Sequence, residues 1–210
     1  NFFFMIALFA LEIPTGTIAD LFGRKRSFVL SCFFSGLGYC LYYFSYGFWQ
    51  FIAVEMIIAI GSALMSGAFD AWMVDSLHYY GFNGNLKKIF GHKHWSIRIV
   101  HIPGPMIGLW LAMSDIALPW LVGGIGQILV GIIAIFLMKE EYFIQEKRSL
   151  LDGFKQMKSI AVDSFHFGIK KISIAWLVFL AFGFAVANQP LNMYWSLQFE
   201  ELFGGKELLS

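Results

Sequence analysis

The chain has 210 residues, of which 58% are hydrophobic and only 14% are charged, and its formal net charge is +1. Soluble domains carry about a quarter charged residues, so this composition argues against a water-soluble shell. The small net charge also argues against a nucleic-acid partner. The mean hydropathy of +0.67 and the 24 phenylalanines instead favour surfaces that face lipid.

Six apolar segments are predicted to be membrane-spanning helices, because a bilayer core needs about 20 apolar residues per helix. They are residues 1–14, 27–46, 48–74, 95–113, 116–138 and 172–197. Sustained alternation is absent from these segments, which disfavours strands, and helices satisfy their own backbone groups in lipid. The first segment is apolar from its start, and the chain does not begin with a methionine. We therefore expect a partial chain, truncated at its start and at its end.

Basic residues are concentrated in alternate connections. Fourteen of the 15 lysines and arginines follow the first, third or fifth segment or begin the fourth, and Lys206 is the remaining one. The positive-inside rule assigns the basic connections to the cytoplasm. The expected location is a bacterial plasma (inner) membrane, with the basic loops cytoplasmic.

The longest connection, residues 139–171, is the expected domain boundary. It separates an N-terminal bundle of five helices, residues 1–138, from the first helix of a second bundle, residues 172–210. Four apolar residues recur in it at helical spacing: Leu150, Phe154, Met157 and Ala161. This spacing is compatible with an amphipathic helix at the membrane interface and equally with a solvated connector that holds a short helix.

The connection after the first segment reads GTIADLFGRKR, residues 16–26. It resembles motif A of the major facilitator superfamily, Gly-x-x-x-Asp-x-x-Gly-Arg-Lys, in which Leu21 replaces a common basic residue. The resemblance implies an all-α, polytopic helical membrane bundle. The six segments would be helices two to seven of that fold, without its first helix. It also implies secondary active transport by alternating access.

The residues of this motif have a plausible chemistry of their own. Gly16 and Gly23 allow a tight turn, and Asp20 can accept backbone N–H groups at a helix N-terminus. Arg24 offers a forked donor to a carboxylate, for which Asp75 is the candidate. The resemblance implies a conformational latch made of Gly16, Asp20, Gly23, Arg24, Lys25 and Asp75. The alternative is a topogenic basic loop with a helix cap.

Ionisable residues within membrane spans usually face the bundle interior and have functions. At 100° per residue, Glu55, Ser62, Ser66 and Asp70 fall within an arc of roughly 80° on the third segment. We expect this polar stripe on one helix face to line a water-accessible path. Burial favours the protonated carboxyl, so Glu55 or Asp70 is a candidate proton carrier, or else a carboxyl hydrogen-bonded between helices. Many proton-coupled members of the resembled family carry an arginine here, whose role cannot be transferred. The coupling or cavity candidates are Glu12, Glu55, Ser62, Ser66, Asp70 and His101.

The fourth segment contains the sequence PGPMIG, residues 103–108. Its Gly104, Pro105 and Gly108 resemble part of motif C, which is associated with antiporters, whereas Val100 and Leu109 depart from that motif. The physical alternative is a proline kink with close helix contact.

The sixth segment ends in amides and large aromatic residues around Pro190. These residues suit a substrate wall or an outer gate, or an interfacial aromatic belt. The substrate-wall candidates are Trp72, Asn188, Gln189, Asn192, Tyr194 and Trp195.

The function expected is proton-coupled export of amphipathic small molecules or drugs, because the helices are aromatic and poor in polar groups. The alternatives are uptake of a nutrient such as a sugar or organic acid, and a membrane-embedded enzyme or receptor-like scaffold. Nucleotide-loop, metal-ligand and catalytic patterns are absent from the sequence. No enzymatic activity and no metal or other cofactor is therefore expected, and a proton gradient would supply the energy. The expected partners are the lipid bilayer, the small-molecule substrate and the remaining helices of the same chain.

Overall fold

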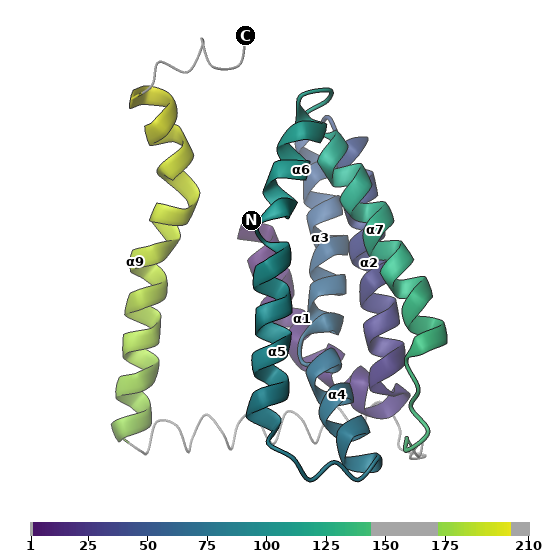
Figure 1. Cartoon of the computed structure of the whole chain (residues 1–210). Coiled ribbons are helices and arrows are strands. Elements are labelled where there is room, and N and C mark those ends of the chain that lie inside the picture. Colours follow the sequence, from purple (N-terminus) through teal and green to yellow (C-terminus); the bar gives the residue numbers. More distant parts are fainter. Residues whose placement is uncertain (1, 144–171, 203–210) are drawn as a thin grey trace. The chain divides into compact units, whose positions relative to one another are not determined.

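The computed structural model describes residues 2–143 and 172–202, and the regular elements in both ranges are α-helices without any strand. The all-helical class predicted from the sequence is therefore confirmed for these residues. The chain divides into two units, Asn1–Met157 and Lys158–Ser210. The helix predicted around Leu150 and Ala161 lies outside the described residues. Figure 1 shows the helices of each unit.

The helices of the first unit are α1 (Phe2–Phe22), α2 (Arg24–Tyr43), α3 (Phe48–Met65), α4 (Ala68–Tyr79), α5 (Leu86–Val100), α6 (Pro103–Ala112) and α7 (Leu118–Leu137). The second unit contributes α9 (Ile172–Leu202), which has Pro190 inside it. Among the residues that the structure describes, two helical stretches are long and apolar enough to cross a membrane: Phe48–Tyr79, which takes in α3 and α4, and Leu118–Leu137. The six-span topology is thus supported at two segments and stays a prediction at the other four.

Two of the predicted segments are interrupted. The continuous helix predicted for residues 48–74 was wrong, whereas the break in residues 95–113 was expected at its prolines. The segment 48–74 breaks between α3 and α4 at Gly67, whose φ of +71° lies in the left-handed region. That region costs a residue with a Cβ roughly 1–2 kcal/mol, which glycine avoids. The segment 95–113 breaks between α5 and α6 just before Pro103, whose missing N–H suits a first helical position.

Helix α2 is packed against both α3 and α7, and the three run side by side in Figure 1. Glycines allow the close approach of α2 and α7. A Cβ at Gly36 would stand 2.8 Å from the backbone oxygen of Gly124, and a Cβ at Gly124 would stand 2.7 Å from the backbone nitrogen of Cys40. Such small residues let helix backbones meet directly.

Side chains from α1 and α2 hold the end of α3, where the chain breaks. The hydroxyl of Thr15 donates to the carbonyl of Ala63 at 3.1 Å, and the hydroxyl of Ser27 donates to the carbonyl of Leu64 at 3.1 Å. The last carbonyls of a helix lack intrahelical donors. These two buried hydroxyls therefore satisfy the end of α3 and fix the position from which α4 departs.

A small core cluster joins α2, α4 and α7. Its buried members are Phe28, Cys32, Ala134 and Met138, and the side chains packed against them are Val29, Met65, Phe69 and Trp72. The ring of Phe69 lies 5.4 Å from that of Phe28 and 5.8 Å from that of Trp72. Because Phe69 stands in the first turn of α4 and packs against this cluster, the cluster anchors that turn.

Candidate functional site

The connection between α1 and α2 consists of Gly23, with φ of +98° and ψ of 147°. Its N–H donates to the carbonyl of Ala19 at 3.1 Å. A Cβ at this position would stand 2.6 Å from Oε2 of Glu140. The positive φ is the reason that glycine is favoured here, and a side chain would in addition displace the carboxylate of Glu140. Gly16, the other glycine of the motif, lies half-buried within α1.

The carboxylate of Glu140 caps the N-terminus of α2. Its Oε1 accepts from the backbone N–H of Arg24 at 2.7 Å, and its Oε2 accepts from the backbone N–H of Lys25 at 3.3 Å. The first N–H groups of a helix lack internal acceptors, and the helix dipole favours an anion there. The side chain of Asp20, predicted as a helix cap, lies outside the described residues. The observed cap is Glu140, which was not among the predicted residues.

Arg24 forms an ion pair with Asp75 of α4, with Nη1 and Oδ2 3.2 Å apart, and the two side chains are 29% and 37% exposed. Lys25 donates from Nζ to the carbonyl of Ile135, in the last turn of α7, at 2.7 Å. We define the loop cluster as Gly23, Arg24, Lys25, Asp75 and Glu140. It joins the start of α2 to α4, to α7 and to the segment that follows α7.

The segment after α7 is also held by Trp72 and Tyr142. The indole of Trp72 donates to the carbonyl of Lys139 at 2.9 Å, and the hydroxyl of Tyr142 donates to the carbonyl of Trp72 at 3.3 Å. Burial raises the pKa of the Tyr142 phenol, and the carboxylates of Glu140 and Asp75 raise it further. Trp72, predicted for a substrate wall, is therefore placed beside the loop cluster.

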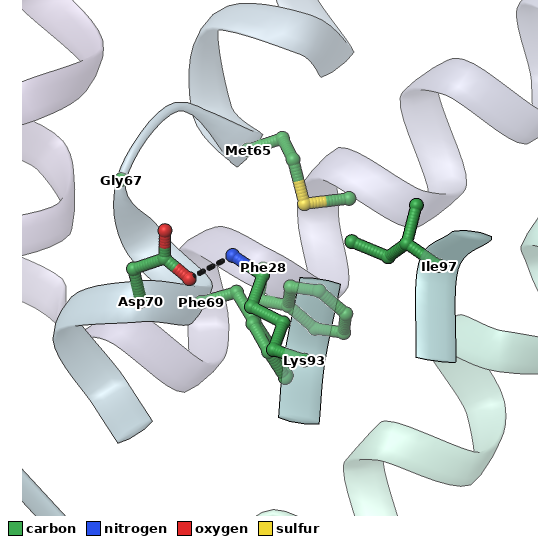
Figure 2. A pocket seen from close by; sticks show the side chains of 7 residues that line it. All are labelled: Phe28, Met65, Gly67, Phe69, Asp70, Lys93 and Ile97. Atoms are coloured by element: carbon green, nitrogen blue, oxygen red, sulfur yellow. Dashed lines mark hydrogen bonds and ion pairs between the residues drawn. The ribbon is translucent and has the colours of Figure 1, made fainter. Parts of the chain in front are cut away.

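A second group of side chains surrounds a cavity of about 430 Å³ at the break between α3 and α4. We define it as the α4–α5 pocket. It is lined by Phe28, Met65, Gly67, Phe69, Asp70, Lys93 and Ile97. Figure 2 shows the amine of Lys93 directed from α5 at the carboxylate of Asp70 on α4. The two form an ion pair, and Nζ of Lys93 lies 5.7 Å from the centroid of the Phe69 ring.

The predicted polar stripe on one helix face is wrong, because Gly67 separates Asp70 from α3. Ser66, at the end of α3, donates to the exposed carboxylate of Glu12 at 3.4 Å. Asp70 instead pairs with Lys93. Ser62 remains half-buried on α3. The polar groups of this segment thus meet different neighbours instead of lining a single path.

Glu55 lies near the start of α3 and accepts a hydrogen bond from the hydroxyl of Tyr42 at 2.7 Å. The Tyr42 ring stacks on Trp120 of α7 at 4.8 Å and lies 5.3 Å from Phe51. A tyrosine from α2 therefore connects this carboxylate to α7. The arrangement fits the predicted alternative of a carboxyl hydrogen-bonded between helices.

The partial motif C region forms the start of α6. A Cβ at Gly104 or Gly108 would meet no described atom within 4 Å. The expected helix break is present, whereas the expected close helix contact is absent from the described part of the chain. Pro105 lies in the first turn of α6. His101, a predicted proton candidate, is the exposed residue that ends α5.

The predicted substrate wall lies in α9. The amide of Asn188 donates to the carbonyl of Phe184 at 2.9 Å, one turn earlier in the same helix. Gln189 is exposed, and the side chain of Tyr194 is 61% exposed. The side chains of Asn192 and Trp195 lie outside the described residues.

Comparisons with known proteins found no match: no family model, no curated protein and no solved structure matches this chain. The resemblance carried by residues 16–26 therefore remains a prediction.

Proposed function

We propose that this chain belongs to a polytopic secondary transporter of the major facilitator type, which works by alternating access in a bacterial plasma membrane. The observation that carries the proposal is the ion pair between Arg24 and Asp75. The motif residue and its partner come from different segments, and charge counting had assigned both to one membrane face. The pair therefore joins elements that a transporter of this kind must hold and release.

The energetics of the loop cluster suit a latch. A partly exposed ion pair contributes about 0–1 kcal/mol, and a helix-capping carboxylate about 1 kcal/mol. Several such contacts bias a conformational equilibrium by a few kcal/mol, which is the range in which both states remain accessible. Hydrophobic burial at the same place would hold the helices together more permanently. The alternative function of these residues is a topogenic basic loop with a cap.

The α4–α5 pocket supports a role in moving amphipathic molecules. Its walls are aromatic rings, a thioether and an aliphatic side chain around one charged pair. Binding sites of this kind bury an apolar ligand and orient it through a few polar groups. Proton-coupled export is the direction we propose, with Asp70 and Glu55 as the coupling candidates.

The test is a substrate screen on the full-length protein in liposomes with an imposed proton gradient. We expect movement of an amphipathic solute, driven by the gradient and reduced in the Arg24→Ala variant, which should insert normally. Turnover of a lipid or peptide without solute movement would overturn the transporter proposal in favour of an enzyme. Gradient-driven uptake of a sugar or organic acid would contradict the proposed direction and cargo.

A further inference from the structure

The α4–α5 pocket already holds a cation, the ammonium group of Lys93. This group contacts the carboxylate of Asp70 and lies 5.7 Å from the centre of the Phe69 ring. The rings of Phe69 and Phe28 are 5.4 Å apart, and Met65 and Ile97 face the same space (Figure 2). A carboxylate and aromatic rings are groups that bind an organic ammonium ion, and a thioether offers an adaptable apolar wall beside them.

The two members of this ion pair differ in how firmly they are held. Asp70 has a short side chain in the first turn of α4, where the helix dipole favours an anion, and the neighbouring Phe69 is packed against the core cluster. Lys93 extends from α5, which has no buried residue, on a flexible four-carbon stem. The anion is therefore the fixed partner, and the cation is the one that can leave.

The cost of removing Lys93 from the pocket is small. The side chains of Lys93 and Asp70 are 26% and 44% exposed, and pairs of this exposure contribute about 0–1 kcal/mol. A long basic side chain can keep its stem on apolar surface while its amine moves into water. The cavity of about 430 Å³ falls in the size range of small-molecule sites, about 300–1,000 Å³.

From this geometry we propose that the α4–α5 pocket is a binding site for organic cations with an apolar body. The ligand's ammonium group takes the place of the Lys93 amine on Asp70 and over Phe69, and its apolar part contacts Met65 and Ile97. Lys93 is thus an internal competitor that occupies the site in the absence of ligand. The inference deepens the proposed transport function by naming the class of cargo, although binding itself requires no transport.

The test measures equilibrium binding to the full-length protein in lipid nanodiscs by calorimetry. The probes are octylammonium, octanol and octanoate, which share one apolar chain and differ in charge. We expect octylammonium to bind more tightly than either of the others. Tighter binding of octanoate would overturn the proposal, because Lys93 would then be the group that anchors the ligand.

Replacing the two members of the Lys93–Asp70 pair should change the affinity for octylammonium in opposite directions. Asp70→Asn should weaken octylammonium binding by about tenfold or more, because a hydrogen bond to a charged group is lost. Lys93→Met should strengthen octylammonium binding by about fivefold. Without the weak internal competitor, a larger fraction of the protein has a pocket that is free to bind ligand. Lys88→Met, an exposed residue of the same helix, makes the same change in charge and should have no effect. A structural ion pair would instead give losses of the same sign in both partner variants, which would refute the proposal.

A second variant addresses misfolding of Asp70→Asn. Phe69→Leu keeps an apolar wall and removes the ring, so octylammonium binding should fall while octanol binding stays the same. An equal loss for both probes would overturn the role of the ring and of the cation site. Flux of octylammonium in liposomes is measured separately. Binding without flux would refute the transport function alone, and flux with unchanged binding in Asp70→Asn would refute the cation site alone.

Discussion

Arg24, the first residue of α2, forms an ion pair with Asp75 of α4, with 3.2 Å between Nη1 and Oδ2. The backbone N–H of the same arginine donates to Glu140 at 2.7 Å. One residue therefore contacts two carboxylates from separate parts of the chain, one through its side chain and one through its backbone. A conformational change that separates α2 from α4 must break the first contact, whereas the second can persist.

Replacement of either partner should impair transport more than stability. Arg24→Ala or Asp75→Ala removes a partly exposed pair, so the free energy of unfolding should fall by less than about 1 kcal/mol. The transport rate should fall clearly in both variants, because the balance between conformational states shifts. Thermal unfolding and flux assays measure the two effects. Arg26→Ala, at an exposed basic residue in the first turn of α2, is the control. Normal transport in both partner variants would falsify the latch.

Glu140→Ala should destabilise the first unit by about 1 kcal/mol, because two N–H groups at the start of α2 lose their acceptor. The matched control is Glu141→Ala. Glu141 is exposed and lies 3.9 Å from Lys139, so its loss should change stability by less than about 0.5 kcal/mol. Denaturant unfolding of the purified protein compares the two variants. Equal effects would show that the cap contributes nothing measurable.

Gly124→Ala should destabilise the contact between α2 and α7 by about 1–3 kcal/mol, because its Cβ would overlap the backbone of α2. The control is Gly126→Ala in the same helix, where a Cβ would meet no described atom within 4 Å. That variant should be neutral or stabilising by up to about 1 kcal/mol, since alanine favours helix. Thermal unfolding measures both, and equal stability of the two variants would contradict the described packing.

The dependence of protein stability on alkaline pH should report the raised pKa of Tyr142. Its pKa is raised in the folded protein, so the folded state keeps the phenol proton at pH values where the unfolded state has lost it. The resulting stability is complete below the usual pKa of about 10 and is lost as pH rises through the folded value. Tyr142→Phe should therefore lose less stability than the wild type between about pH 8 and about pH 11. Tyr46→Phe, at a residue that is 87% exposed, should behave like the wild type.

Neutralising the two candidate carboxyls should separate their roles in coupling. Asp70→Asn should reduce the dependence of transport on the proton gradient, because Asp70 is part of an ion pair that ligand and proton can both disrupt. Glu55→Gln keeps an acceptor for the Tyr42 hydroxyl and should have a smaller effect on the same dependence. Flux measured at several external pH values compares the variants. An unchanged dependence in both would remove these residues from the coupling role.

The sequence was sufficient to predict the helical class and the approximate positions of most helices, whereas α4 was merged with α3 and most of α5 lies where a connection was predicted. It also identified Asp75 as the candidate partner of Arg24, because both residues stand at the ends of apolar runs that charge counting assigns to one side. Hydrophobic periodicity and charge act locally along the chain. Features that depend only on hydrophobic periodicity and charge could therefore be predicted without a structure.

The break at Gly67, and the contacts that depend on it, could not be predicted from the sequence. The apolar run continues through Gly67, and a glycine within such a run is compatible both with a continuous helix and with a left-handed turn. The pairing of Asp70 with Lys93 depends on how α5 returns beside α4, which no local pattern encodes. Glu140 stands next to another glutamate in a charged connection, so nothing in the sequence marks it as a cap.

The missing side chain at Gly23 makes room for a carboxylate that arrives 116 positions after Arg24. Glu140 consequently connects the point where the chain leaves α7 to the first turn of α2. A displacement of Glu140 would therefore act on the first turn of α2 directly, in addition to any effect through the packing of α2 on α7. The same turn carries the ion pair of Arg24 with Asp75, so the exit of the chain from α7 and that pair share one support.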